Sequence, residues 1–404
     1  MIAEWAAGEL PSTWKTAGRG WGHPLHKLSP YVGGFPAQLA RFFVLNLSDP
    51  GQTVHDPFSG GGTTALEALL CDREAVASDA FEYAYTLSHA KAKPLGRDAF
   101  AAYLSEKLAE ADSVEPRLDN DDLRVFFSDR TLSQLLRLRA VLAGDDSREA
   151  LFTKAVVCGV LHGPSRMFLS APQKDQTSST VEYVRRYLER HGIERPERDV
   201  YESAMNKAGR SGLDALPERA GRVFRSDARG TPLADGSVDL VVTSPPYLAV
   251  LDYSWNNWLR LWWLGKDRLE ERRKLILSRR EDVYCAFMRD ALADMYRVLR
   301  RDSAAVMVVG DVRRGDAVLN SALLLAEEAA KVGFDVECVI DDVYELNARS
   351  MLVLNSLKWG YSEGAHAEKS SVPIDRCLVL RKGRIRWRWP EIDWALAPTR
   401  LAGS

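Results

Sequence analysis

Short apolar runs rich in β-branched residues recur along this chain and predict the strands of a buried sheet. Segments with helical spacing separate most of these runs, which indicates parallel strands joined by helices. We expect strands at residues 54–56, 74–79, 222–227, 238–242, 304–311, 334–340 and 376–381. Helices are expected at residues 37–44, 64–70, 282–299 and 322–332. The pattern therefore predicts an α/β fold with a Rossmann-like sheet and helices on both faces.

The stretch from residue 81 to about residue 220 interrupts this alternation. Apolar residues recur there at helical spacing over residues 99–111, 130–142, 150–161 and 179–191. Such a block is far too long for one crossover connection, so we expect an inserted helical subdomain at residues 96–220. It separates residues 1–95 from residues 221–404.

Basic residues follow the last helix of this insert and the loop after it. They are Arg185, Arg186, Arg190 and Arg195. A charged helix face is usually only a solvated surface, but such a row can also contact phosphates. The sequence leaves both interpretations open.

Four further segments lie in the C-terminal part. Residues 252–265 are rich in aromatic side chains and predict a helix that ends at Gly265. The first turn of this helix, closest to Tyr247, is a candidate for lining a ligand pocket, while its tryptophans can also belong to the core. Residues 266–280 are strongly charged and are expected to be exposed. Residues 346–371 are polar and predict a mobile loop. The tail, residues 381–389, alternates basic and aromatic side chains, as either an edge strand or a nucleic-acid contact would.

Composition narrows the class of protein. The chain has 404 residues, a formal net charge of -2 and a pI near 6.4, so any nucleic-acid contact must come from a local basic surface. Five scattered cysteines without a CxxC pair argue against a zinc site or a disulfide framework and favour a reducing compartment. We find no signal peptide and no long apolar span, and therefore expect a soluble, cytoplasmic protein without a membrane contact.

One candidate site follows the strand at residues 238–242. The chain continues as Thr243-Ser244-Pro245-Pro246-Tyr247, and proline cannot donate to a sheet ladder, so the two prolines must form a stiff turn past the strand. Ligands of open α/β sheets bind at this end of the strands. Backbone carbonyls, the Ser244 hydroxyl and the Tyr247 ring can together hold a planar group that carries an NH2. The alternative is an ordinary strand-ending turn.

A second candidate site, the glycine motif, follows the strand that ends at Asp56. Glycines at positions 60 to 62 allow close backbone approach, and the next helix turns free N–H groups toward a ligand. The second strand ends on Asp79, where nucleotide-binding βαβ units carry an acid that takes the ribose hydroxyls. We therefore predict a nucleoside-type cofactor. The alternative is an α/β unit whose glycines serve tight packing.

Both motifs resemble those of one known family. Residues 56–63, Asp-Pro-Phe-Ser-Gly-Gly-Gly-Thr, resemble the D-P-F-x-G-x-G-T motif of S-adenosylmethionine-dependent amino-methyltransferases that act on DNA. Residues 243–247 resemble their catalytic motif, in which Ser-Pro-Pro-Tyr is typical of cytosine-N4 enzymes. The resemblance implies a Rossmann-like methyltransferase sheet, S-adenosylmethionine as cofactor and direct methyl transfer to the N4 atom of an extruded cytosine.

The resemblance also implies roles for individual residues. The catalytic set is Ser244, Pro245, Pro246 and Tyr247. The cofactor-binding set is Phe35, Asp56, Phe58, Gly60, Gly62, Thr63, Thr64, Asp79, Asp227 and Thr243. Within it, Asp79 is expected to bind the ribose, Asp227 the adenine amino group, and Phe35 belongs to the segment expected to close over the methionine end.

Several alternatives remain open at this point. Guanine-N2 methyltransferases of tRNA use similar motifs, adenine-N6 enzymes usually carry Asp or Asn in place of Ser244, and a non-catalytic binding module would keep only the fold. Many cytosine-N4 enzymes place the catalytic motif first, whereas here the glycine motif comes first. Double-stranded DNA is the implied substrate, with a cognate restriction endonuclease as a candidate partner. Monomer and homodimer both stay open.

Overall fold

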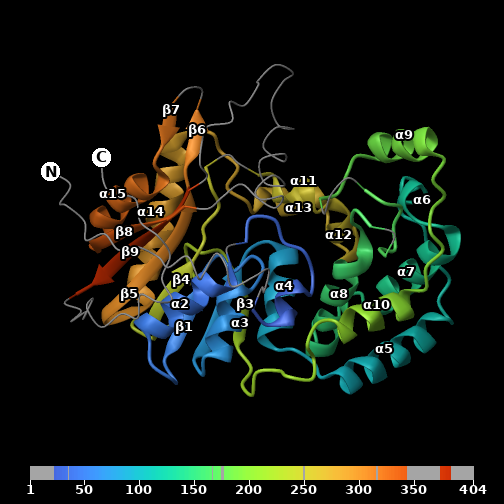
Figure 1. Ribbon diagram of the computed structural model, residues 1–404, viewed down its shortest axis with the longest axis horizontal. Helices are drawn as coiled ribbons and strands as arrows, with labels where there is room; N and C mark the ends of the chain where they lie inside the picture. The colour runs from blue at the N-terminus through green and yellow to red at the C-terminus, as the bar shows by residue number, and fades with distance from the viewer. Residues whose placement is uncertain are drawn as a thin grey trace.

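Parallel strands form the centre of the fold, with one antiparallel strand inserted near an edge (Figure 1). The computed structural model describes residues 22–34, 36–165, 167–173, 177–248, 251–314, 317–343 and 374–383. Within them a seven-stranded sheet has the order β3-β2-β1-β4-β5-β9-β8. The strands are β1 (Thr53–Asp56), β2 (Glu74–Asp79), β3 (Arg222–Arg225), β4 (Val238–Thr243), β5 (Leu299–Gly310), β8 (Asp335–Val343) and β9 (Ile374–Lys382). The predicted α/β class and Rossmann-like sheet are confirmed.

Strands β3, β2, β1, β4 and β5 run parallel, so their carboxyl ends meet at one edge. Strand β9 pairs antiparallel with both β5 and β8. A separate hairpin joins β6 (Val312–Arg314) to β7 (Ala317–Leu319). Each of the two motifs thus follows the end of a central parallel strand, β1 or β4.

Helices cover both faces of the sheet. Residues of α2 (Ala37–Leu47) and α3 (Thr63–Leu70) pack with Val54, Leu240 and Val306 on one face. Residues of α14 (Glu281–Val298) and α15 (Ser321–Val332) pack on the other face. The strands read as continuous apolar runs because both of their faces are buried in this way.

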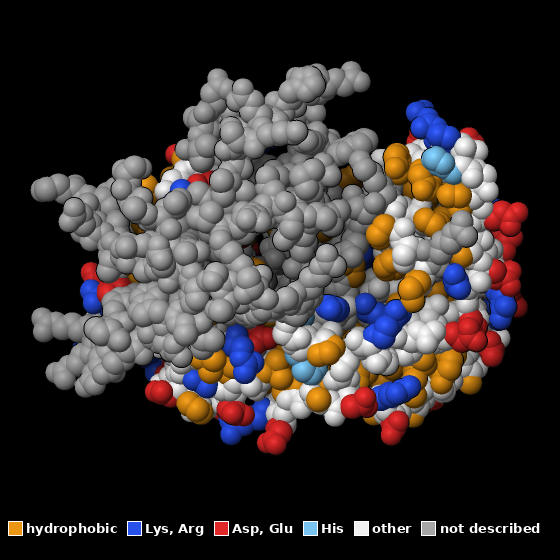
Figure 2. Space-filling view, viewed as in Figure 1, with side chains coloured by type: hydrophobic (Ala, Val, Ile, Leu, Met, Phe, Trp, Pro, Cys, Tyr) orange, Lys and Arg blue, Asp and Glu red, His pale blue; other side chains and the backbone are white. Residues whose placement is uncertain are grey.

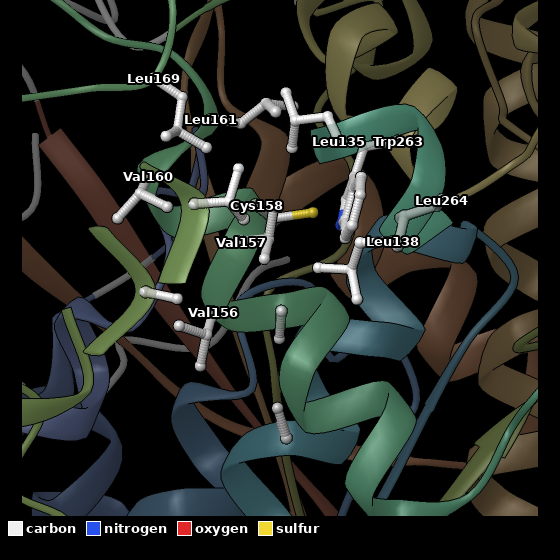
Figure 3. Packing of buried hydrophobic residues seen from close by; sticks show 14 of the residues in the cluster. Leu135, Leu138, Val156, Val157, Cys158, Val160, Leu161, Leu169, Trp263 and Leu264 are labelled. Carbon is white, nitrogen blue, oxygen red and sulfur yellow. The ribbon is translucent and has the colours of Figure 1, made fainter. Parts of the chain in front are cut away.

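A layer of helices extends from the β3 side of the sheet, on the right in Figure 1. It consists of α5 (Arg97–Ala111), α6 (Leu123–Phe126), α7 (Asp129–Val141), α8 (Arg148–Leu161), α9 (Val181–His191) and α10 (Val200–Gly209). Helix α4 (Glu82–Ala92) contacts both this layer and strands β2 and β3. In the core of the layer, Trp263 lies beside Leu135, Leu138 and Cys158 (Figure 3).

The expected helix at residues 252–265 is two helices, α11 (Tyr253–Asn256) and α12 (Trp258–Trp263). The break lies at Asn257, whose side-chain amide donates to the Tyr253 carbonyl at 3.0 Å. This side chain takes over the bond of a backbone N–H, which is how Asn competes with helix continuation. The Asn257 Oδ1 atom also accepts from Arg260 at 2.8 Å. The prediction of one uninterrupted helix was wrong.

The expectation of exposure for residues 266–280 was only partly right. Helix α13 (Arg268–Arg273) folds back toward the sheet, and Glu271 on it is buried. A carboxylate oxygen of Glu271 accepts from the Glu82 backbone N–H at 2.8 Å, which explains why a charged side chain can be buried there. The loop predicted at residues 346–371 lies outside the described residues, as does the tail beyond Gly383. Among the described residues, no helix combines the length and the apolar character needed to span a membrane.

Candidate active site

A cavity lies at the carboxyl ends of β1, β2 and β4, where the two motifs meet. It holds about 820 Å³ of non-protein space, including the open solvent at its mouth. Its walls are Tyr31, Gly33, Gly34, Pro57, Phe58, Ser59, Gly60, Gly61, Thr63, Asp79, Ala80, Phe81, Asp227, Ala228, Ser244, Pro246, Tyr253, Lys274, Leu275, Ile276 and Phe287. The cavity therefore contains members of both predicted sets.

The glycine loop between β1 and α3 has a backbone that only glycine adopts easily. Gly60 has φ +45° and Gly62 has φ +71°. A methyl group added to Gly62 would lie 2.9 Å from the Ser88 Cα atom, and one added to Gly60 would lie 2.8 Å from the Tyr31 ring. The glycines thus serve both the turn and the close approach of neighbouring elements.

Side chains of helix α4 hold this loop by hydrogen bonds to the backbone carbonyl groups of the loop. The Lys91 ammonium donates to the Gly61 carbonyl at 2.6 Å and to the His26 carbonyl at 3.1 Å. Ser88, one turn earlier, donates to the Gly60 carbonyl at 3.2 Å. Lys91 is buried, and burial lowers the pKa of its amine to about 7. These contacts hold the Gly60 and Gly61 carbonyls against α4.

Asp79 connects the end of β2 to the glycine loop. One carboxylate oxygen accepts from the Gly60 N–H at 2.9 Å, and the other accepts from the Phe81 N–H at 2.9 Å. Burial raises the pKa of Asp79 to about 6, opposed by these hydrogen bonds. Since a carboxylate offers about four acceptor sites, the group can still receive a ligand hydroxyl.

Asp56 joins the two motifs beneath the cavity. Its Oδ1 atom accepts from the Thr243 hydroxyl at 2.6 Å and from the Phe58 N–H at 3.2 Å. The Thr64 hydroxyl donates to the Val242 carbonyl at 3.0 Å and adds a second link to β4. Burial raises the pKa of Asp56 to about 7. This group of residues sets the distance between the glycine motif and the Ser-Pro-Pro-Tyr motif.

The Ser-Pro-Pro-Tyr motif contributes Ser244 and Pro246 to the cavity wall. The Pro246 carbonyl accepts from the Tyr284 hydroxyl at 3.1 Å, which anchors the turn to α14. Tyr247 is half-buried beside the cavity wall, and its ring packs so closely on Gly310 that an added methyl would lie 2.8 Å from it. The Tyr247 hydroxyl lies 3.5 Å from a carboxylate oxygen of Asp375 on β9.

At the β3 end of the cavity, Asp227 forms an ion pair with Arg229. The guanidinium donates to both carboxylate oxygens, at 3.0 and 2.7 Å, and lowers the pKa of Asp227. Arg229 also lies over the Phe287 ring, 5.1 Å from its centre. The ring centres of Phe287 and Phe58 lie 6.2 Å apart, so this end offers a carboxylate close to two aromatic rings.

The structure gives each described residue of the predicted sets a place. The lining members are Phe58, Gly60, Thr63, Asp79, Asp227, Ser244 and Pro246. Those outside the lining are Asp56, Gly62, Thr64, Thr243, Pro245 and Tyr247. Phe35 lies outside the described residues.

Several lining residues had no signal that pointed to the site in the sequence. Tyr31 stacks on Tyr253, with ring centres 5.9 Å apart and planes at 18°, and together they form one wall. The segment Lys274 to Ile276 after α13 forms another, although it was expected to be exposed. For Tyr253 the sequence did carry a signal, because the first turn of the segment 252–265 was predicted to line a pocket, and Tyr253 in the cavity wall confirms this.

Comparison with known proteins gives one family match. A family model described as DNA methylase matches residues 11–90, the part that contains the glycine motif. A search of curated proteins finds no match.

Solved structures with some likeness belong to several kinds of methyltransferase. A candidate DNA modification methylase from Thermus thermophilus is 23% identical over 41% of this chain, with a TM-score of 0.24, and this chain spans only 55% of that protein. TrmN from Thermus thermophilus is 14% identical over 89% of this chain and 52% of its own, with a TM-score of 0.33. A geranyl diphosphate methyltransferase is 9% identical over 94% of this chain and 89% of its own, with a TM-score of 0.35. Such low scores carry no weight for function.

Proposed function

We propose that this chain is an S-adenosylmethionine-dependent DNA methyltransferase that methylates the exocyclic N4 atom of cytosine. The observation that carries the proposal is the meeting of two motifs in one cavity. Asp79 and the glycine loop line the cavity together with Ser244 and Pro246, so the first pair would hold the nucleoside and the second pair the base. The match of residues 11–90 to a DNA methylase family supports DNA as the substrate.

The residues around the cavity fit the proposed cofactor. Asp79 would accept from the ribose hydroxyls, and the aromatic rings of Phe58 and Phe287 offer faces to an adenine. Asp227 would accept from the adenine amino group beside its bidentate contact with Arg229, since a carboxylate offers about four acceptor sites. When bound, the cofactor supplies a sulfonium methyl group, which the amino nitrogen takes up as it loses one proton.

The Ser-Pro-Pro-Tyr motif would hold the base. The Ser244 hydroxyl and the Pro245 carbonyl would accept hydrogen bonds from the amino group and orient its nitrogen. The Pro246 carbonyl is already bonded to Tyr284, so this turn is rigid before a base enters. Tyr247, held between Gly310 and Asp375, would stack on the extruded base at the border of the cavity.

Expression in a host that lacks DNA methylation tests this proposal. Mass spectrometry of the nucleosides and modification-aware sequencing are expected to find N4-methylcytosine in one repeated context. N6-methyladenine alone would keep the reaction class but contradict the cytosine assignment. Unmodified DNA together with methylated tRNA, from a well-expressed protein that binds the cofactor, would move the substrate to RNA.

Substitution of Tyr247 separates the base from the cofactor. Tyr247→Ala is expected to keep cofactor affinity while turnover falls at least about tenfold, since stacking on an aromatic ring contributes about 1–3 kcal/mol per base. Isothermal titration calorimetry and single-turnover methylation measure the two quantities. Equal loss of both would show that the residue supports the fold of the site and not the base.

A further inference from the structure

The surface formed by α11 and α13 combines an exposed aromatic ring with basic side chains. Trp255 is 40% exposed and Leu269 is 52% exposed. The Arg268 guanidinium lies over the Trp255 ring, 5.0 Å from its centre. Arg273 is exposed on the same helix as Arg268. We refer to these four residues of the two helices as the α11–α13 surface, in which Arg273 lies about 140° around α13 from Arg268.

The exposure of Trp255 contrasts with its neighbours. Trp262 and Trp263 on the next helix are buried in the core of the helical layer. Trp258 donates its indole N–H to the Ser179 carbonyl at 3.1 Å. The same short stretch buries Trp262 and Trp263 and partly buries Trp258, so Trp255 is the one exposed tryptophan of residues 252–265.

Arg268 and Arg273 differ from other cations of the same segment. Arg272, Lys274 and Arg280 each pair with a carboxylate, but Arg268 and Arg273 form no ion pair with the described residues. On α9, by contrast, Arg185 and Arg186 share the carboxylate of Glu182. A cation that stacks on an indole and lacks a carboxylate is ready to meet an anion.

Net charge supports a polyanion as the partner. Residues 266–280 contain seven Lys or Arg and three Asp or Glu, a net charge of +4, whereas the whole chain carries -2. Of the three acids, Glu271 is buried and Asp267 accepts from the Glu270 N–H as the cap of α13. Where Figure 2 shows the described surface, basic and acidic side chains are intermixed.

The helices of this surface adjoin residues of the cavity wall. Tyr253, on the same helix as Trp255, lines the cavity, and so does the segment Lys274 to Ile276 that follows α13. Asp252 links the two helices: one oxygen accepts from Arg272 at 3.0 Å and the other from the Trp255 N–H at 3.1 Å. Trp255 therefore lies on a helix that also contributes to the cavity wall.

We propose that the α11–α13 surface binds the DNA strand next to the extruded target base. Trp255 stacks on a flanking base that extrusion has left without its neighbour, and Arg268 and Arg273 contact the adjoining phosphates. This inference rests on the proposed function and names the protein surface that holds its substrate.

Trp255→Ala, Arg268→Gln and Arg273→Gln test the surface. The probe is a labelled duplex that carries the context methylated in the host, and binding is measured by fluorescence anisotropy at several salt concentrations. Trp255→Ala is expected to weaken DNA binding about tenfold or more. Each arginine variant is expected to lower the slope of log affinity against log salt by about 1. Cofactor affinity stays unchanged in all three.

Matched controls and separate outcomes keep this test decisive. Tyr201→Ala removes a similarly exposed aromatic ring on α10 and is expected to bind DNA as the wild type does. If all three variants keep the wild-type DNA affinity and salt slope, the inference is overturned. The proposed function still stands in that case if the wild type methylates DNA. If only Arg185→Gln and Arg186→Gln lose DNA affinity, the contact lies on α9 and the inference is overturned as well. If the wild type binds tRNA and no duplex, the partner is RNA and both proposals fail.

Discussion

Gly62 is the last residue of the glycine loop before helix α3 begins. Its φ is +71°, and a methyl group at this position would lie 2.9 Å from the Ser88 Cα atom, which is backbone and cannot move aside. We expect Gly62→Ala to destabilise the protein by about 1–3 kcal/mol and to weaken cofactor binding, measured by chemical denaturation and calorimetry.

Gly51 provides the control for this substitution. It has φ +82° in the turn before β1, but an added methyl would meet no atom within 4 Å. Gly51→Ala therefore tests backbone strain without the clash and is expected to leave cofactor affinity unchanged. A Gly62→Ala variant that binds the cofactor like the Gly51→Ala variant would contradict the proposed close fit.

Asp56 makes a pH-dependent contribution to stability. Burial raises its pKa from 3.8 to about 7 in the folded protein, so between these values the native state binds more protons than the unfolded state. The free energy of unfolding must then fall as pH rises through that window, by up to about 4 kcal/mol at about 1.4 kcal/mol per pKa unit.

Asp56→Asn checks this pH dependence, because the amide keeps the Oδ1 acceptor for Thr243 and Phe58 but does not titrate. Denaturation is measured at about pH 4.5 and about pH 7.5, which enclose most of the window between the two pKa values. The stability of the variant relative to the wild type is expected to be greater at the higher pH. An equal difference at both pH values would mean that the Asp56 carboxyl keeps an ordinary pKa.

At the scale of single elements, α4 positions the glycine loop. Lys91 lies buried with two carbonyl partners and without a carboxylate partner among the described residues, an arrangement that is costly unless the contact matters. We expect Lys91→Met to weaken cofactor binding about tenfold or more, since hydrogen bonds to charged groups contribute about 1.5–3 kcal/mol. Calorimetric titration with the cofactor measures the effect.

Lys93→Met is the matched control, because Lys93 follows the same helix and makes no described hydrogen bond to the loop. If Lys91 only supports the fold, Lys91→Met will lower the melting temperature while the affinity of the remaining folded protein stays unchanged. Retained affinity of this kind would refute the positioning role.

The strands and the cavity walls differ in how far the sequence predicted them. The strands before the glycine motif and before Ser244 were predictable, because apolar runs end there on residues that cannot continue a strand. The walls at Tyr31 and Phe287 were not, since they come from separate segments that only the fold brings together, whereas the closeness of Tyr253 to Tyr247 in the sequence pointed to the site. The break at Asn257 depends on side-chain bonds to Tyr253 and Arg260, which no periodicity reveals.

At the scale of the whole molecule, the helical layer and the helices that pack on the sheet form one hydrophobic cluster. The cluster around Trp263 includes Leu66 of α3, Leu87 of α4 and Phe152 of α8, and it therefore crosses the boundary at residue 96 that the sequence predicted for an insert. Helix α12, from beyond residue 220, also lies inside this core. We accordingly expect residues 96–220 to unfold together with the cofactor side of the sheet and not as a separate unit.

Trp263→Ala tests this coupling. Trp263 is 2% exposed and donates its indole N–H to the Lys154 carbonyl at 3.1 Å, so its truncation is expected to cost about 3–5 kcal/mol. Native-state hydrogen exchange should then lose protection in α8 and also in β2 and β3, because α4 packs on both. Trp255→Ala, at an exposed position, is the control and should shift stability by no more than about 0.5 kcal/mol. Loss of protection confined to residues 96–220 would mean that the insert is an independent unit after all.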